Sequence, residues 1–485
     1  MVHDIAHIPK LTAADMAAIR NLSYYGVSWD ESQPTGGYTR TGYLAGFPVS
    51  QTLPDALLPI QALMRRCILN DSGEVVYYLD PTDSTKNANG DPSDLTGADG
   101  QVMVEIPKFY LRYSYSGTTH TWDVSLYPLP GFTVHEAFNK NGVEVNYRYM
   151  SAYEGVLYDV SESLYANGIY QTAVSCVFAN ADKSLTIATR SHWASKLAVG
   201  DKIVVSGTTN NNGTKTVATV ESDTKITIDE AVTNETAGST VIETQKDWAN
   251  DKLCSVSGKA PINQGTRANF RTAAANRGTG WRQQDFDLDS AVQLLFLTEY
   301  ADWNSQSMIG NGLTDWTSAW PSWNDYNPIN FTGLTNTLGN ATGNLSNGNG
   351  VVGSYMSYRG IENFFGHVWK WVDGINIHDR VPYVSNTDTD FADDTTTNYT
   401  ALGVTLATSN NYIVTLEQIA RGFLPASVGG TSSTYVTDFY YQNTGRRVAR
   451  LGGSANGALP AGVACWSLSD ASGALDRAVS GRLAF

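Results

Sequence analysis

The chain has 485 residues, more than one hydrophobic core usually serves, so its length predicts about two to four domains. Hydrophobic residues make up 42% of the sequence and aromatic residues 11%, which is enough for well-packed cores and excludes disorder on a large scale. The formal net charge of −15 argues against nucleic acid as a partner, because phosphate binding needs basic patches.

Residues 1–45 are predicted to form an attachment or oligomerisation segment. A variant capping box at Thr12 to Asp15 predicts a short helix ending near Arg20, and the aromatic, strand-like run NLSYYGVSWDES follows it. The start of the chain has no basic stretch followed by an apolar one, so no secretory signal is expected. No stretch approaches the roughly 20 apolar residues of a membrane span, so membrane insertion is not expected.

Residues 46–170 are predicted to form one mixed α/β unit, the first part of the body. The run LPDALLPIQALMRRCIL begins with helical spacing of its apolar residues and then becomes strand-like. The segments EVVYYLD at 74–80 and QVMVEIPKFYLRYSY at 101–115 alternate with period two and are predicted strands. The polar stretch between them does not fit the register of an EF-hand, so it is predicted to be a solvated loop.

Residues 171–246 differ in character from their surroundings. Short strands such as GDKIVVSG and TKITIDEAV are separated by Gly, Asn and Asp turns, which predicts a small all-β barrel or sandwich. The segment NNNG at 210–213 predicts a hairpin turn. Removing the whole stretch joins SLYANGIY to KAPINQGTRANF, so we interpret it as a domain inserted into a larger one.

Residues 247–485 are predicted to be the largest unit. Their best helix is DLDSAVQLLFLTEYADW at 287–303, whose apolar positions repeat at helical spacing and whose expected N-cap is Asp289 or Ser290. The rest of this unit is mostly loops, and its many indoles indicate a compact, loop-heavy fold. The tryptophans concerned are Trp303, Trp316, Trp320, Trp323, Trp369 and Trp371.

Three segments of this unit carry a resemblance to a known family: GTRANFRTAAANRGTGWRQQDF, RGIENFFGHVWKWVDGINI, and GRRVARLGGSANGALPAGVACWSL with the terminal GRLAF. In this order they resemble the C-type-lectin-like fold of the formylglycine-generating-enzyme (sulfatase-modifying-factor) superfamily. The nearest resemblance is to its phage branch, tail proteins whose C-terminus is varied by diversity-generating retroelements. The blocks RRCILNDSGEVVYYLDPTDSTK and DGQVMVEIPKFYLRY also resemble phage tail-tip and tail-fibre proteins.

The resemblance implies an α+β multidomain chain with a C-type-lectin-like C-terminal domain, an inserted small all-β domain and an N-terminal attachment segment. It implies a phage tail receptor-binding protein, a host adhesin of the virion that is made in the host cytoplasm. The expected partners are a host cell-surface receptor, protein or glycan, and other tail or baseplate proteins, and the relatives imply a homotrimer. The alternatives are a structural baseplate or fibre connector and, third, a tail-associated glycosidase with two distant carboxylates.

The chain is not expected to be an enzyme. Oxidase members of the superfamily use two closely spaced C-terminal cysteines, whereas Cys465 in GVACWSL has no second cysteine nearby. We therefore interpret Cys67, Cys176, Cys254 and Cys465 as buried free thiols. The seven histidines never pair at metal-ligand spacing, and no phosphate loop or nucleophile elbow is present.

The segment FFGHVWKWVDG resembles the G-N-V-W-E-W signature of the superfamily, with His367 and Lys370 in place of Asn and Glu. In the family those two residues support a calcium-associated loop, so their replacement argues against calcium, and no cofactor is expected. From the residues alone, Val368 alternating with Trp369 and Trp371 predicts a core strand with packed indoles.

The stretch from about 446 to 485 is predicted to be the variable region that binds the receptor. In the phage relatives Asn codons are altered at adenines and cannot then encode Lys, Glu, Gln or Met, and 454–479 contains none of these four. Substitutions on an exposed surface usually cost under ~0.5 kcal/mol, so small residues between fixed ones suit a changeable face. The predicted ligand-facing residues are Ser454, Ala455, Asn456, Leu459, Pro460, Ser467, Ser469, Asp470, Leu475, Asp476 and Ala478. The predicted scaffold residues are Trp369, Trp371, Gly452, Gly453, Trp466 and Arg482.

Overall fold

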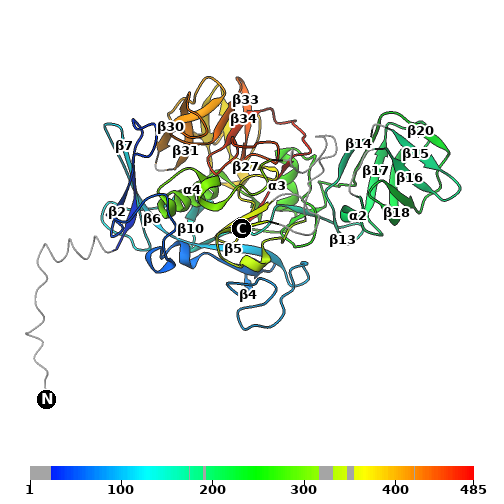
Figure 1. Cartoon of the computed structure of the whole chain (residues 1–485), viewed down its shortest axis with the longest axis horizontal. Coiled ribbons are helices and arrows are strands. Elements are labelled where there is room, and N and C mark those ends of the chain that lie inside the picture. The colour runs from blue at the N-terminus through cyan, green and yellow to red at the C-terminus, as the bar shows by residue number, and fades with distance from the viewer. Residues whose placement is uncertain (1–22, 174, 189–192, 316–330, 347–353, 420) are drawn as a thin grey trace, which may run out of the picture.

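The computed structural model describes residues 23–485 except 174, 189–192, 316–330, 347–353 and 420. The predicted helix ending near Arg20 and the indoles of Trp316, Trp320 and Trp323 lie outside the described residues. The described chain forms a broad body from which one smaller module projects (Figure 1). In the described part, no helix has both the length and the apolar character needed to cross a membrane.

The structure shows that the predicted α+β, C-type-lectin-like fold class is wrong, because the described chain is predominantly β. In the described part of residues 247–485, short strands are separated by turns and loops, and Phe286–Tyr300 is the only helix longer than nine residues. The described α-helices are α2 (Trp193–Lys196), α3 (Arg267–Ala275), α4 (Phe286–Tyr300) and α5 (Ser305–Ile309).

Helix α4 lies at the centre of the body, and all of its residues are buried. The helix predicted at 287–303 is confirmed, but its N-cap is Asp285 and not Asp289 or Ser290. The Asp285 side chain accepts a hydrogen bond from the backbone N–H of Leu288 at 3.0 Å. Because the helix packs against several elements at once, its polar residues are buried together with its apolar ones.

Two large sheets of the body are built mainly from strands of the N-terminal half of the chain. In spatial order the five-stranded sheet is β2 (Tyr38–Gly42), β1 (Tyr25–Asp30), β7 (Thr119–Ser125), β6 (Tyr110–Ser116) and β8 (Thr133–Val134). The six-stranded sheet is β23 (Arg282–Gln283), β36 (Leu483–Ala484), β11 (Tyr147–Ser151), β5 (Gln101–Pro107), β3 (Arg65–Leu69) and β4 (Val75–Tyr78). The strands predicted at 74–80 and 101–115 are confirmed as β4, β5 and β6. Strand β1 pairs with β7, so residues 25–42 belong to the body.

A third large sheet belongs to the C-terminal part of the chain. In spatial order it is β29 (Thr400–Ala401), β28 (Val381–Val384), β27 (Trp369–His378), β33 (Arg446–Leu451), β34 (Trp466–Asp470), β32 (Phe439–Gln442), β30 (Asn411–Ile419) and β31 (Gly422–Val428), with β35 (Val479–Ser480) parallel to β27. One face of this sheet packs on α4 through buried residues such as Tyr440, Leu451 and Trp466, which belong to the main hydrophobic core.

Smaller sheets and single turns complete the body. They are the sheet β13 (Leu164–Ala166), β12 (Val156–Asp159) and β22 (Lys252–Cys254), the pair β10 (Val143–Glu144) and β9 (Asn139–Lys140), and the sheet β24 (Gly343–Ser346), β25 (Ser354–Tyr358) and β26 (Ile361–Glu362). The 3-10 turns are Asp55–Leu57, Gln61–Leu63, Glu136–Phe138, Asn336–Leu338 and Asp388–Asp390. The first two of these turns stand where apolar residues before β3 have helical spacing.

The projecting module is an eight-stranded antiparallel sheet. Its order is β14 (Tyr170–Ala173), β21 (Thr240–Thr244), β17 (Lys202–Ser206), β18 (Gly213–Ser222), β19 (Lys225–Ile228), β16 (Ser184–Ile187), β15 (Cys176–Ala179) and β20 (Glu235–Ala237). Its hydrophobic core contains only residues between Ile169 and Ile242. The entering strand β14 and the leaving strand β21 are antiparallel neighbours, with Tyr170 opposite Glu243.

A buried arginine ties the end of the chain to the middle of the body. Arg482 is 1% exposed. Its guanidinium donates to the backbone carbonyls of Ser151 at 3.1 Å and Asn363 at 2.8 Å, and also to the carbonyl of Glu362. The side chain therefore joins β11 to the turn after β26 through backbone groups.

Candidate recognition surface

The sheet that contains β34 presents a second, partly open face. In β34, Ser467 lies opposite Arg450 of β33 and opposite Tyr441 of β32. Since side chains alternate across a strand, these three point away from the face that carries Trp466 toward α4. Arg450 and Tyr441 are half-buried, so this face presents accessible side chains on paired strands.

A continuous row of aromatic rings crosses this face. The rings of Tyr412 and Phe439 are 5.2 Å apart, those of Phe439 and Tyr441 are 4.7 Å apart, and those of Tyr441 and Trp369 are 6.0 Å apart, centroid to centroid. Tyr412, Phe439 and Tyr441 are half-buried, and Trp369 is 9% exposed. Such rings give large contact area at low cost in side-chain entropy, which is why they dominate binding surfaces.

Arg450 closes one end of the aromatic row. Its guanidinium lies 4.9 Å above the ring of Trp369, within the range of a cation–π contact. Its Nε is 3.0 Å from Oδ2 of Asp470, and its Nη1 is 3.8 Å from Oδ2 of Asp476. These ion pairs position the segment from Asp470 to Asp476 beside the ring, and Leu475 in that segment is 57% exposed.

A second loop lies at the other end of the row. The backbone N–H of Phe439 donates to the carbonyl of Pro460 at 3.0 Å, which places the loop next to the phenyl ring. The amide of Gln306 in α5 donates to the carbonyls of Ala458 at 2.9 Å and Ala461 at 2.7 Å and holds the loop from inside. Leu459 at its tip is 59% exposed.

The predicted ligand-facing residues fall into two groups. Those that the structure leaves exposed or half-buried lie in the two loops and at the end of β34: Asn456, Leu459, Pro460, Ser469, Asp470, Leu475 and Asp476. Those that are at most 4% exposed cannot contact a ligand from these positions: Ser454, Ala455, Ser467 and Ala478. Their side chains are small enough to fit beneath larger neighbours, so small size in this stretch does not mean exposure.

The predicted scaffold residues are buried, and one of them, Trp369, also forms the end of the aromatic row. Trp369, Trp371, Trp466 and Arg482 are at most 9% exposed. Gly452 and Gly453 have φ values of 94° and 76°, in the left-handed region that favours glycine.

Sequence reasoning missed four residues that make up most of this face. Tyr412, Phe439 and Tyr441 precede the predicted variable region of about 446–485, and Arg450 lies within it but is not among the predicted ligand-facing residues. The available signal was the alternation of aromatic residues in DFYYQ, which places Phe439 and Tyr441 on one face of a strand. We define the recognition surface as Tyr412, Phe439, Tyr441, Trp369 and Arg450 together with loops 456–460 and 469–477.

Burial beneath the surface sets the chemistry of its groups. Burial raises the pKa of Tyr441 to about 12, so its hydroxyl stays protonated and can donate a hydrogen bond. Cys465 lies under the row, and burial raises the pKa of its thiol well above the usual value. The prediction of free, buried thiols is confirmed for all four cysteines.

A calcium ion does not fit the residues at the FFGHVWKWVDG segment. The buried carboxylate of Glu154 faces Nζ of Lys370 at 3.1 Å and the ring nitrogen of His367, and the ammonium also donates to the carbonyl of Gly366 at 2.7 Å. Calcium is bound by oxygen ligands, whereas nitrogen groups surround this carboxylate. Among the described residues, no three His, Cys, Asp or Glu side chains are grouped to hold a metal ion.

Comparisons with known proteins give little further information. No family model matches the chain, and no curated protein matches it. Among solved structures, it is similar to the phage phi92 endosialidase with 15% identity, over 41% of this chain and 34% of that chain, about a third of its length, and with a TM-score of 0.15. A likeness at this TM-score establishes neither a shared fold nor a shared activity.

Proposed function

We propose that the chain is a phage tail protein that binds a receptor on the host cell through the recognition surface. The observation that carries the proposal is the row of half-buried rings of Tyr412, Phe439 and Tyr441, which ends at Trp369 and Arg450 and is flanked by two exposed loops. Tyrosine, tryptophan and arginine are the residues most often found at the energetic centre of binding surfaces. The sequence blocks around 65–86 and 99–113, which resemble tail-tip and tail-fibre proteins, support the same function.

The two loops suit a surface whose specificity changes. Asn456, Leu459 and Leu475 are exposed, so substitutions there leave the hydrophobic core intact. Error-prone copying of the C-terminal codons would then alter the ligand while the sheet stays folded. Assembly of three copies of the chain into a homotrimer on the tail would multiply weak contacts, since avidity can exceed single-site affinity by roughly 10² to 10⁴.

The proposal is tested by titrating the labelled full chain onto a panel of bacterial strains. The variants are Phe439→Ala, Leu459→Asp and Leu475→Asp, each of which alters a different part of the surface. We expect loss of about 2 kcal/mol of binding free energy for Phe439→Ala, or roughly a 30-fold weaker Kd.

A matched control is Val199→Asp, which places the same charge on a residue of the projecting module that is 72% exposed. It should bind as the unaltered chain does, and thermal unfolding of all four variants checks that each is folded. Equal binding by folded surface variants would rule out this surface. Failure of the same variants to assemble into particles, with cell binding unchanged, would instead favour the structural connector.

A further inference from the structure

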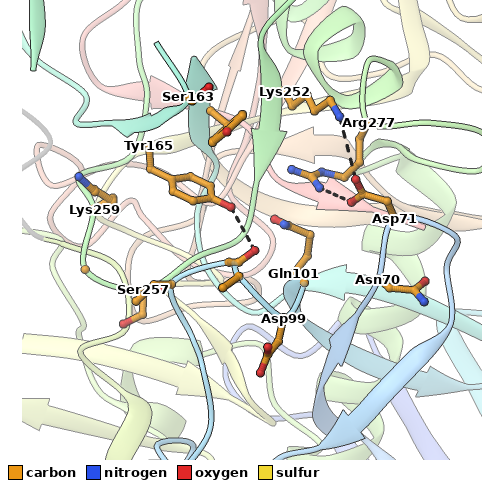
Figure 2. Close-up of a pocket in the computed structure, with 16 residues that line it drawn as sticks. Asn70, Asp71, Asp99, Gln101, Ser163, Tyr165, Lys252, Ser257, Lys259 and Arg277 are labelled. Carbon is orange, nitrogen blue, oxygen red and sulfur yellow. Dashed lines mark hydrogen bonds and ion pairs between the residues drawn. The ribbon is translucent and has the colours of Figure 1, made fainter. Parts of the chain in front are cut away.

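A polar cleft lies where the body meets the strands that lead to the projecting module. Its cavity has a volume of about 820 Å³, within the range of roughly 300 to 1,000 Å³ typical of small-molecule sites. Loop 96–100 and Gln101 form one wall, and Tyr158 and Tyr165 of β12 and β13 form the other. Figure 2 shows the amide of Gln101 and the hydroxyl of Tyr165 directed toward each other across the cleft.

The charges in the cleft are not balanced. Arg277 pairs with Asp71 at 2.5 Å between Nη1 and Oδ1, and Lys252 lies 4.0 Å from the other oxygen of the same carboxylate. The second acidic group of the lining, Asp99, accepts a hydrogen bond from Tyr77 at 2.7 Å. Within the described residues, Lys259 forms no ion pair, so the cleft keeps an excess of positive charge although the chain carries −15.

The rest of the lining suits a ligand rich in hydroxyl groups. Asn70, Ser163 and Ser257 contribute side-chain groups that both donate and accept hydrogen bonds. The two tyrosines stand edge to face with centroids 4.9 Å apart and supply the aromatic part of the wall. Asn70 and Ser257 already bond to Glu74 at 3.1 Å and to Asn336 at 3.2 Å, and each keeps further hydrogen-bonding capacity that a ligand hydroxyl can use.

We propose that this cleft binds a hexuronic acid unit of a saccharide, with its carboxylate neutralised by Lys259 and its hydroxyls bonded to the polar groups of both walls. The cleft contains no residue of the recognition surface, so this is a second binding site that goes beyond the proposed function. Variants in the cleft test saccharide binding, and variants in the recognition surface test cell binding, so failure of one proposal is distinguishable from failure of the other.

The test is calorimetric titration of the full chain with glucuronic and galacturonic acid, each beside its neutral counterpart, glucose and galactose. We expect at least one of the acids to bind with a Kd of about 1 mM or below, roughly tenfold tighter than the neutral sugar. Added salt should weaken binding of the acid, because the cleft is open to solvent. Absence of binding by both acids, or equal binding of acid and neutral sugar, would overturn the proposal.

Two variants locate the site. Lys259→Gln removes the positive charge, leaves a polar side chain one atom shorter, and should remove the preference for the acid. Lys86→Gln, on a loop outside the cleft, should not change it. Inorganic phosphate is the competitor that separates a saccharide site from a simple anion site. Displacement of the bound acid by phosphate at equal concentration would show the latter and would contradict the saccharide assignment.

Discussion

At the scale of single residues, Asp438 connects the recognition surface to the core. Its Oδ2 accepts a hydrogen bond from the backbone N–H of Ala464 at 2.7 Å, and it directly precedes Phe439 in the aromatic row. A Cβ atom at Gly462 would lie 2.1 Å from its Oδ1, so any larger residue there would displace the carboxylate. Burial raises the pKa of Asp438 to about 7.

This raised pKa predicts a pH dependence of stability. The folded chain keeps the Asp438 proton up to about pH 7, whereas the unfolded chain loses it near 3.8. Between these values the folded state binds more protons, so the free energy of unfolding falls as the pH rises. Asp438→Asn keeps the acceptor for Ala464 and should reduce that fall by roughly 2 kcal/mol or more, given ~1.4 kcal/mol per pKa unit.

Urea unfolding of both chains at several pH values between about 4.5 and 7.5 measures the difference, since other carboxylates contribute equally to both. Parallel curves for the variant and the unaltered chain would show that Asp438 is already ionised at low pH.

The burial of side chains in the C-terminal stretch was only partly predictable from the sequence. A lone cysteine beside Trp466 indicates a buried thiol, because nothing nearby can ligate or oxidise it, and the structure agrees. Exposure of the small residues was not predictable in the same way. Ser467 points to the open face, yet it is 1% exposed, and it lies between the larger residues Tyr441 and Arg450 of the neighbouring strands.

At the scale of elements, the projecting module has its own core. Ile226 is fully buried in the module core and Leu295 of α4 is fully buried in the body core. We expect the full chain to unfold in urea in two steps, because no residue belongs to both of these cores.

Ile226→Ala should lower the urea midpoint of one step only, and Leu295→Ala should lower the midpoint of the other step. Each substitution should reduce the unfolding free energy of its own step by about 2–5 kcal/mol. Emission of Trp193, the module's single tryptophan, assigns the module step after comparison with Trp193→Phe. A single transition that both variants shift together would mean that module and body fold as one unit.

The elements also show why the predicted fold class failed. Period-two alternation identified β4, β5 and β6, and helical spacing identified α4, because each pattern is local. The capping residue of α4 was misplaced because several acidic residues precede its apolar run, and only packing selects Asp285. Pairing of distant strands, such as β36 beside β11, leaves no trace in a local pattern.

At the scale of the whole molecule, Arg482 links parts of the chain that are far apart in sequence. Its removal leaves the buried carbonyls of Ser151 and Asn363 without their donor. Arg482→Ala should therefore lower the stability of the body by roughly 3 kcal/mol or more.

Arg446→Ala, at an exposed position of β33, is the control and should change stability by less than about 0.5 kcal/mol. Thermal and urea unfolding measure both variants. A similar small effect of Arg482→Ala would show that water replaces the guanidinium, so the end of the chain would not be fixed by this side chain.

The recognition surface is itself a property of the whole molecule. Trp369, Tyr412, Tyr441 and Arg450 come from strands β27, β30, β32 and β33, and the order of these strands in the sheet brings them together. No sequence pattern connects them. The exposed residues among the predicted ligand-facing set therefore lie in the two loops, and the aromatic residues between the loops are not in that set.

The adjacent positions of β14 and β21 have a practical consequence. The chain leaves the body and returns to it through two paired strands, so the two points where the module joins the body lie next to each other. Any compact domain whose own termini are close together could be grafted at this place without altering the spacing of the body strands. The position is therefore a natural attachment point for a fluorescent reporter, which would label the body without changing the recognition surface.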